Sequence, residues 1–466
     1  MPKEERTNRV GHLPEPSSNL GRREFLTATA AGGMGLALEP AAGQQTAAKP
    51  KGGSGKLRVV LVGTGGRGST NWGRNLVRNY GDVVEFVGLC DINRKRMAVA
   101  RDFMGVTCPM FMDTEFDEMI RKTSPDWVIV TTIDSFHPKY ICRAMELGID
   151  VISEKPMSTD EKMVQEILDT ERRTGRKLII AENYRFSPDA ATIKKIIDSE
   201  ELGIITSVDY NVYLDTSHGT SYFRRWHGFK QFNGSILDSE GSHFLDLVQW
   251  WLGAEPAEVQ AFGSLRRYGY NGEYRSPRCM NCPHAGKCEF FWDITKDKFS
   301  MDFYVNAESE DGYIRDGCVY RRDINVWDTM TLNVRYHTGV LMSFSLNAFM
   351  PYEGFRIGFN GTKGRLDARA YHAQPWKVDG PLEIRVTPLF KESRTMGIEK
   401  EPEGITGGHW GSDAKLQNSI FRGPLPDPLH QRTTNREAAF ACLLPIAARR
   451  SIEQQRHVFI EELVKI

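Results

Sequence analysis

From residue 57 onward, short apolar runs alternate with stretches of helical periodicity. The runs are β-branched and nearly continuous, which is typical of parallel strands buried on both faces of a sheet. Strands separated by helices predict a doubly wound α/β sheet, whose ligands bind at the carboxyl ends of the strands. The expected strands are residues 57–62, 83–89, 126–132, 150–153 and 177–181.

The first expected strand leads directly into a glycine-rich turn, residues 63–68, of the form G-x-G-x-x-G. The first glycine permits the tight turn, and the second lets the backbone approach a pyrophosphate. The third lets the next helix, expected over residues 69–79, pack closely, with the phosphates at its N-terminus. The motif predicts a Rossmann dinucleotide-binding domain whose loop ligands are Gly63, Gly65, Gly66, Arg67 and Gly68.

An acidic residue, Asp91, ends the second expected strand. A carboxylate at this place accepts hydrogen bonds from the ribose hydroxyls of adenosine and repels a 2′-phosphate. NAD is therefore favoured over NADP as the cofactor. The basic residues Arg94 and Lys95 are close in sequence and keep NADP open as the less favoured alternative.

The later strands also end in polar residues, among them Glu154-Lys155-Pro156 after the fourth strand and Glu182-Asn183-Tyr184-Arg185 after the fifth. Because the carboxyl ends of parallel strands meet at one edge of the sheet, we expect these residues beside the dinucleotide. The additional cofactor-binding residues predicted here are Thr131, Thr132, His137, Glu154, Lys155 and Asn183.

A second pattern, in which apolar and polar residues alternate, follows residue 187. It predicts an α+β domain, because alternation with a period of two is typical of strands with one buried face. The expected domains are the Rossmann domain, residues 56–186, and a second domain, residues 187–430, with a cysteine-rich insertion at 275–320. Residues 431–466 are expected to form a helical segment that packs back on the body, with its helix over 435–451.

The G-x-G-x-x-G turn, Glu154-Lys155-Pro156 and the later segment 234–246 together resemble the Gfo/Idh/MocA oxidoreductase family. The resemblance covers the chain from about residue 57 to the C-terminus. It implies that Lys155 lies beside the nicotinamide and the substrate hydroxyl, and that a cis peptide bond precedes Pro156. It also implies that the second domain holds a large, open, mostly antiparallel sheet, whose outer face mediates a homo-oligomer.

In segment 234–246, His243 matches the histidine of the family. Family members usually carry an acid four residues earlier, where this chain has Ser239 between Asp238 and Glu240. The resemblance implies that His243 and Lys155 handle the substrate proton, with Asp238 as a candidate carboxylate partner. Alternatively, the segment only caps the following helix, through the hydroxyl of Ser242.

The expected function is hydride transfer between a nicotinamide and a carbon of a carbohydrate. Tyr184 or Arg185 would orient the sugar, and Tyr184 is also a candidate base. The aromatic stretch 213–232 either stacks on sugar faces in the cleft or packs between the domains. His409, in a segment that resembles one of family members, either faces the pocket or lies in a loop without such a role.

The first 55 residues differ in character and predict an export signal followed by a linker. A polar stretch leads to Arg22-Arg23-Glu24-Phe25-Leu26 and then to an Ala/Gly-rich, mildly apolar run over residues 27–38. Paired arginines before such a run resemble a twin-arginine (Tat) signal and predict a periplasmic or extracytoplasmic location. A disordered N-terminal tail is the alternative.

Export would change how the enzyme obtains its cofactor, because no pool of free NAD exists outside the cytoplasm. An exported enzyme would keep its NAD bound and regenerate it in each turnover. One alternative function is therefore an NAD-dependent glycoside hydrolase of the same family, which oxidises C3 transiently and eliminates the aglycone. A second alternative is a non-catalytic NAD-binding sensor, which the serine at position 239 favours.

The composition and the charge of the chain indicate which classes of binding partner to expect. The chain has 60 basic and 60 acidic residues, so its formal net charge is zero, and a nucleic-acid partner is not expected. No apolar run approaches the ~18 residues of a membrane-spanning helix. A small carbohydrate remains the expected substrate.

The insertion contains a cysteine cluster. Cys279, Cys282, Cys288 and Cys318 have a spacing that suits a tetrahedral structural zinc site, with His284 as an alternative fourth ligand. Disulfides are the competing use in an exported protein, and unligated thiols are the third alternative.

Overall fold

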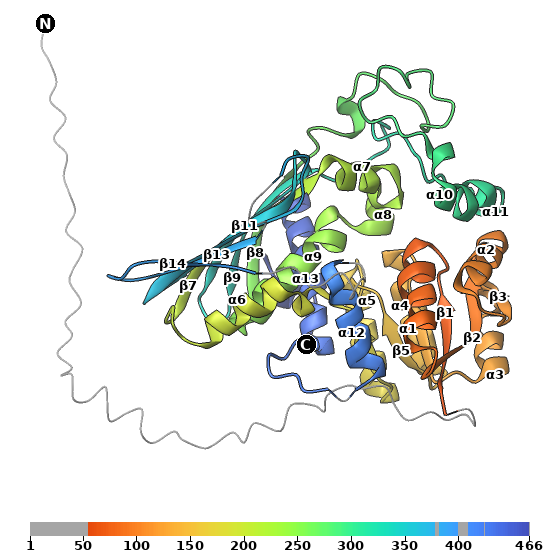
Figure 1. Ribbon diagram of the computed structural model, residues 1–466, viewed down its shortest axis with the longest axis horizontal. Coiled ribbons are helices and arrows are strands. Elements are labelled where there is room, and N and C mark those ends of the chain that lie inside the picture. Colours follow the sequence, from red (N-terminus) through yellow and green to blue (C-terminus); the bar gives the residue numbers. More distant parts are fainter. Residues whose placement is uncertain (1–54, 378–381, 399–408, 424, 466) are drawn as a thin grey trace, which may run out of the picture. The chain divides into compact units, whose positions relative to one another are not determined.

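The computed structural model describes residues 55–377, 382–398, 409–423 and 425–465 (Figure 1). The expected export signal, with all but the last residue of its linker, lies outside these residues. No helix in the described ranges is both long and apolar enough to cross a membrane.

The first sheet has six parallel strands in the order β3-β2-β1-β4-β5-β6. This order confirms the predicted Rossmann fold. The strands are β1 (Leu57–Val62), β2 (Val84–Asp91), β3 (Met110–Met112), β4 (Trp127–Val130), β5 (Asp150–Ser153) and β6 (Leu178–Ile180). Only β3 was not expected, because three residues are too few to give a periodic signal.

Helices connect these strands. The chain leaves the glycine loop through a π-helical segment, η1 (Gly68–Arg74), rather than directly into the α-helix expected there. The α-helices are α1 (Asn75–Tyr80), α2 (Arg94–Met104), α3 (Phe116–Thr123), α4 (His137–Glu146) and α5 (Glu161–Thr174).

The second sheet has nine strands in the order β14-β13-β12-β11-β7-β10-β9-β8-β15. All neighbouring pairs are antiparallel except β7 with β10, which confirms the predicted mostly antiparallel sheet. The strands are β7 (Ile205–Asp215), β8 (Pro256–Ser264), β9 (Thr329–Tyr336), β10 (Leu341–Met350), β11 (Glu353–Gly361), β12 (Gly364–Ala373), β13 (Leu382–Pro388), β14 (Arg394–Gly397) and β15 (Val458–Phe459).

One face of this sheet packs on helices and the other carries exposed residues. The exposed face includes Phe262 of β8 and Leu341 of β10. The homo-oligomer expected at this face stays a prediction. The remaining helices are α6 (Pro188–Asp198), α7 (Thr216–Arg224), α8 (Lys230–Asn233), α9 (Ser242–Leu252), α10 (Lys298–Phe303), α11 (Glu308–Asp311), α12 (Ser412–Phe421) and α13 (Asn435–Gln454).

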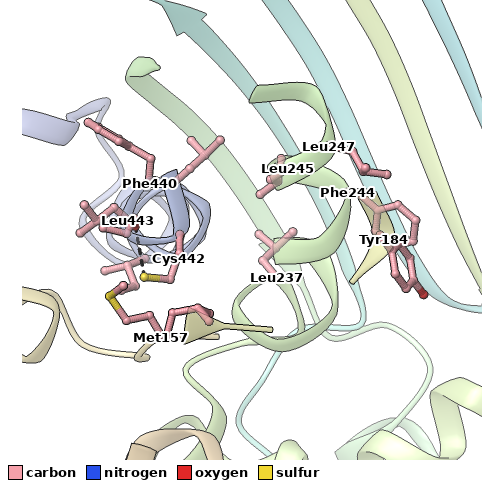
Figure 2. Packing of buried hydrophobic residues seen from close by; sticks show 14 of the residues in the cluster. Met157, Tyr184, Leu237, Phe244, Leu245, Leu247, Phe440, Cys442 and Leu443 are labelled. Carbon is pink, nitrogen blue, oxygen red and sulfur yellow. Dashed lines mark hydrogen bonds between the residues drawn. The ribbon is translucent and has the colours of Figure 1, made fainter. Parts of the chain in front are cut away.

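The C-terminal helix α13 returns to the centre of the molecule and packs on β8 and α9, as expected. Figure 2 shows Cys442 and Leu443 of α13 beside Met157, with Leu245 of α9 on the side toward Tyr184. The turn that carries Lys155 is therefore anchored in the same apolar core as α9. The end of the chain also differs from the helical expectation, because β15 adds an edge strand to the second sheet.

The helix α12 follows the second sheet in sequence but packs into the core of the Rossmann domain. Its residues Leu416, Ile420 and Phe421 join the apolar cluster that contains Trp72. Gln417 also donates a hydrogen bond from Nε2 to the carbonyl oxygen of Asn71, at 3.0 Å. The chain therefore returns to the glycine-loop side of the first domain.

A buried ion pair joins the end of the Rossmann domain to α9. The Arg185 guanidinium donates two hydrogen bonds to the Asp246 carboxylate, at 2.8 and 2.6 Å, and both side chains are at most 1% exposed. Burial costs each charge its hydration and raises the pKa of Asp246, and the pairing with Arg185 offsets part of that cost. The position of α9 therefore depends on both residues.

We expect Asp246→Asn to lower the free energy of unfolding by about 3–5 kcal/mol, because the buried Arg185 charge loses its hydrogen-bonded carboxylate and keeps only the more distant Glu437, at 3.4 Å, among the described residues. Urea unfolding followed by circular dichroism measures this loss. The control is Glu462→Gln, which breaks the exposed pair between Arg456 and Glu462 and should leave the midpoint nearly unchanged. Equal midpoints for the two variants would contradict the role of the buried pair.

Candidate functional site

The glycine loop at the end of β1 is shaped by close backbone contacts. A Cβ on Gly63, whose φ is +92°, would lie 2.7 Å from the carbonyl carbon of Thr131. A Cβ on Gly68 would lie 2.1 Å from the carbonyl oxygen of Gly63. The Thr131 hydroxyl donates to that same oxygen, at 2.6 Å. The first and last glycines of the motif are therefore required by the packing of the loop on β4.

The carboxylate of Asp91 lies at the end of β2, directly beside this loop. It accepts hydrogen bonds from the Thr64 backbone N–H at 2.6 Å, the Thr64 hydroxyl at 2.8 Å and the Asn93 N–H at 3.0 Å. The guanidinium of Arg96 approaches it to 3.5 Å. This is the place at which a Rossmann carboxylate meets the adenosine ribose.

Arg67, inside the glycine motif, binds two carboxylates. Its Nε donates to Glu154 at 2.6 Å, and its two terminal nitrogens donate to Asp413 at 2.7 Å each. Burial alone would lower the pKa of Arg67, but Glu154 and Asp413 outweigh it and raise that pKa. In turn, Arg67 and His409 hold the pKa of the buried Asp413 far below its usual range.

Asp413 was missed in the sequence, although the expected His409 segment contains it. It comes from α12, and it also accepts a hydrogen bond from Asn183 Nδ2, at 2.6 Å. His409 Nδ1 lies 2.9 Å from the same nitrogen of Asn183 and 3.1 Å from Asp413. His409 therefore belongs to this site rather than to a remote loop.

The Lys155-Pro156 turn after β5 contains the expected cis peptide bond. His137 links this turn to β4, since its Nδ1 lies 2.8 Å from the Pro156 carbonyl oxygen and its Nε2 lies 3.2 Å from that of Thr132. Lys155 Nζ donates to the carbonyl oxygen of Ser239. Ser239 belongs to η6 (Leu237–Gly241), so the lysine connects the Rossmann sheet to the start of α9.

His243 lies next to Tyr184, with the two rings stacked at 3.9 Å and 7° between their planes. The carboxylate oxygen nearest to His243 Nδ1 belongs to Glu182, at 3.9 Å. Both of these atoms are buried and have no hydrogen-bond partner in the described part of the chain. The sequence placed Glu182 at a strand end but gave it no role. Its neighbour in space, His243, lies 61 residues later in α9. Only the packing of the two domains brings the two side chains together.

Burial sets the protonation of this group. It lowers the pKa of His243 well below its usual value, and the charges of Lys155 and His409 lower it further. Burial also raises the pKa of Glu182 and that of Tyr184. At neutral pH the imidazole and the phenol are therefore uncharged, and the imidazole can accept a proton.

Glu240 is the second acid of this segment. It accepts a hydrogen bond from the Tyr222 hydroxyl, at 2.7 Å. Although burial opposes ionisation, the nearby His218 and Lys155 charges lower the pKa of Glu240. Its carboxylate is therefore ionised at neutral pH.

An open cavity of about 390 Å³, lined mostly by polar residues, lies beside α7, the helix that carries Tyr222. His218 faces this cavity, with its ring 5.0 Å from that of Tyr222 and its Nδ1 3.0 Å from Glu353. A cavity of this size and polarity suits a small polyhydroxylated molecule. Its lining residues are Asp215, Ser217, His218, Ser221, Glu353, His372 and Ala373.

Asp238 makes its contacts with Ser235 and with α13. Its carboxylate accepts a hydrogen bond from the Ser235 hydroxyl at 2.6 Å and lies 3.8 Å from Arg449 of α13. Burial raises the pKa of Asp238 to about 6, against the opposing effect of Arg449. These contacts point to a role in holding η6 on α13, and its predicted catalytic role stays a prediction.

The zinc site expected at Cys279, Cys282, Cys288 and Cys318 is not supported. No group of three or more His, Cys, Asp or Glu side chains within the described ranges is arranged to hold a metal ion. The guanidinium of Arg224 lies 2.9 Å from the Cys279 sulfur and donates to it, so a cation already occupies one side of that sulfur. The eight cysteines are all free thiols, so the disulfide alternative is not formed either.

The residues present fit a dinucleotide. The glycine loop, Asp91 and the polar edge of the sheet surround one region, and the buried oxygen of the Asn183 amide has no partner among the described residues. Family models agree with this assignment. The model of the oxidoreductase family with an NAD-binding Rossmann fold matches residues 57–182, and the model of its C-terminal α/β domain matches residues 194–381. The chain belongs to the Gfo/Idh/MocA oxidoreductase family.

Three curated relatives support this membership. YteT of Bacillus subtilis (strain 168), named as an oxidoreductase, is 33% identical over 88% of this chain and 99% of its own length. The inositol 2-dehydrogenase/D-chiro-inositol 3-dehydrogenase of Lactiplantibacillus plantarum is 24% identical over 64% of this chain and 80% of its own length. Glycosyl hydrolase family 109 protein 1 of Akkermansia muciniphila is 28% identical over 40% of each chain.

Among solved structures, the WlbA dehydrogenase of Bordetella pertussis, in complex with NADH and UDP-GlcNAcA, superposes with a TM-score of 0.60. It is 20% identical and covers 87% of this chain and 98% of its own. This likeness shows a shared fold, a Rossmann domain followed by a domain with an open sheet.

We expect Asp238→Asn to change how stability depends on pH. The folded pKa of about 6 lies above the ordinary 3.8, so between about pH 4 and 6 the unfolded chain releases a proton that the folded protein keeps. Stability due to this group therefore falls as pH rises through that window, by about 1.4 kcal/mol for each unit of pKa difference.

The asparagine variant should lack this pH-dependent loss of stability. Unfolding midpoints measured from pH 4 to 7 would show the difference. A variant with the wild-type pH profile of stability but a turnover reduced more than a hundredfold would instead support a catalytic Asp238.

Proposed function

We propose that the protein is an NAD-dependent oxidoreductase that acts on a CH–OH group of a carbohydrate or polyol. The observation that carries this proposal is the hydrogen bond from Lys155 Nζ to the carbonyl oxygen of Ser239, four residues before the buried His243, whose pKa is lowered by burial and by the Lys155 charge. The polar cavity beside Tyr222 suits a substrate with several hydroxyl groups. The inositol dehydrogenase relative acts on a polyol, which agrees with this substrate class.

The glycine loop and Asp91 would hold the dinucleotide, whose nicotinamide would supply hydride transfer at the carbinol carbon. The chain's own residues handle the proton. The uncharged imidazole of His243 takes it from the substrate hydroxyl, while the Lys155 ammonium donates a hydrogen bond to the oxygen that becomes the carbonyl oxygen. Stacking on Tyr184 fixes the plane of the imidazole. In the reverse direction the same groups return the proton.

We propose further that NAD stays bound between turnovers. This part of the proposal rests on the Arg22-Arg23 export pattern, since an enzyme outside the cytoplasm has no free NAD to exchange. Asp91 at the end of β2 supports NAD rather than NADP.

Denatured wild-type protein should release close to one equivalent of NAD, measured by mass spectrometry of the supernatant. Addition of the correct sugar or polyol to the native protein should reduce the bound NAD, with a rise in absorbance at the nicotinamide band. Lys155→Met should lower the rate of this reduction by about 10²–10⁴-fold, because it removes a group that acts on the substrate proton and oxygen.

The matched control is Lys162→Met in α5, an exposed lysine, which should reduce NAD at the wild-type rate. Equal rates for the two variants would contradict the assignment of Lys155.

A redox-neutral glycoside hydrolase is the second candidate, which the family 109 relative favours. In this scheme C3 is oxidised, a base removes the acidified C2 proton, the aglycone leaves, water adds, and the hydride returns to C3. His243 is the available base. An aryl glycoside panel tests it: release of the aryl alcohol without net NADH supports this candidate, and no release from any common sugar contradicts it.

A further inference from the structure

Part of the insertion between β8 and β9 reaches back to the cofactor domain. We call residues 298–313, which contain α10 and α11, the arm; Figure 1 shows these helices beside α2. The contacts are specific. Asn93 Nδ2 donates to the Ala307 carbonyl at 3.0 Å, and Arg96 donates from one nitrogen to the Phe303 carbonyl at 3.3 Å and from another to Asp311 at 2.7 Å.

Aromatic packing adds an apolar contact to these polar ones. Phe103 of α2 meets the arm residues Phe299 and Phe303 edge-on, with ring centroids 5.8 and 5.5 Å apart. Phe299 and Phe303 stack on each other at 4.2 Å. Phe303 is 2% exposed. The arm is therefore a packed part of the Rossmann side of the protein, although it belongs in sequence to the second domain.

Tyr304 places its hydroxyl on the glycine loop. The Gly66 backbone N–H donates to this hydroxyl at 2.7 Å, and a Cβ on Gly66 would lie 3.1 Å from the same oxygen. Gly66 directly follows Gly65, the second glycine of the G-x-G-x-x-G motif, which lets the loop backbone approach a pyrophosphate. A phenol both accepts and donates. Within the described residues, the hydrogen of this hydroxyl has no acceptor.

Cationic side chains surround the same tyrosine. The guanidinium groups of Arg96 and Arg315 lie over its ring, 5.5 and 5.4 Å from the centroid. Arg96 is already paired with Asp91 and Asp311. In contrast, the buried Nε of Arg315 has no hydrogen-bond partner, and this side chain has no ion pair with an acid in the described ranges. A positive group without an acid partner beside the glycine loop suits a phosphate ligand.

We propose that the arm completes the dinucleotide site together with Arg315, which follows it in the insertion: Tyr304 of the arm donates a hydrogen bond to the pyrophosphate of the cofactor, Arg315 adds its charge, and the arm slows release of the cofactor. This inference rests on the proposed NAD dependence. The motif-derived ligands all come from the Rossmann sheet and its loops, whereas these two come from the insertion. The arm also covers the turn after β2, where Asp91 meets the adenosine ribose in proteins of this fold.

The test is the rate at which bound NADH leaves the full-length protein, followed by the loss of its fluorescence after dilution into an excess of NAD. Tyr304→Phe keeps the ring and removes only the hydroxyl. We expect it to release NADH about tenfold faster, as for the loss of one hydrogen bond to a charged group. Asp311→Asn, which loosens the arm from Arg96 without touching the loop, should also accelerate release.

Tyr270→Phe is the matched control, because Tyr270 is an exposed tyrosine of the same insertion that lies outside the arm. It should release NADH at the wild-type rate. Thermal unfolding of each apo variant checks that it folds.

Wild-type release rates in both Tyr304→Phe and Asp311→Asn would overturn the proposed role of the arm while leaving NAD dependence intact. Slower release from Tyr304→Phe would overturn it as well, because the hydroxyl would then compete with the cofactor for the Gly66 N–H. Failure of the wild-type protein itself to bind NAD or NADH would contradict the proposed function, and the arm's role with it.

Discussion

Arg67 stands between two carboxylates that come from distant parts of the chain, Glu154 from the turn after β5 and Asp413 from α12. Each of these acids is buried, so loss of the guanidinium would leave two unpaired negative charges away from water. Trp72 strengthens the arrangement by donating its indole N–H to Glu154, at 2.6 Å. Arg67 therefore holds three segments in one arrangement: the glycine loop, the turn that carries Lys155, and the helix α12.

The chemistry of the site follows from that arrangement and from burial. Lys155, adjacent to Glu154, can reach the Ser239 carbonyl only because the turn is held on both sides, by Arg67 and by His137. The same exclusion of water favours neutral forms of His243 and Glu182. Lys155 and the neutral His243 therefore lie on neighbouring segments, and a neutral imidazole can accept a proton.

The local patterns in the sequence predicted what depends on local structure. The strand β1, the glycine turn and Asp91 are encoded by residues adjacent in sequence, and they are found as expected. The helix α13 was predicted for the same reason, whereas the cis Lys155-Pro156 bond, also found, was implied by the family resemblance. The three-residue β3, the π-helical start at η1 and the edge strand β15 were not predicted, because none of them is long enough to give a period.

The remainder of the site depends on contacts between residues far apart in the chain. Asp413 lies 346 residues from Arg67, and no periodicity near either residue indicates the pair. The cysteine spacing suggested zinc, but spacing does not show that Arg224 from α7 reaches the Cys279 sulfur. Likewise, the acid nearest to His243 is Glu182 of the first domain, whereas sequence proximity favoured Asp238.

The arm and the polar cavity are formed by different elements of the second domain. The contacts of the arm to the first domain are with the glycine loop and with α2 and the turn before it, which is the side of a Rossmann domain that receives adenosine and pyrophosphate. The polar cavity is instead built by α7 and by strands of the second sheet, with His218 and Glu353 across it. Different elements therefore form the contacts of the arm and the lining of the cavity.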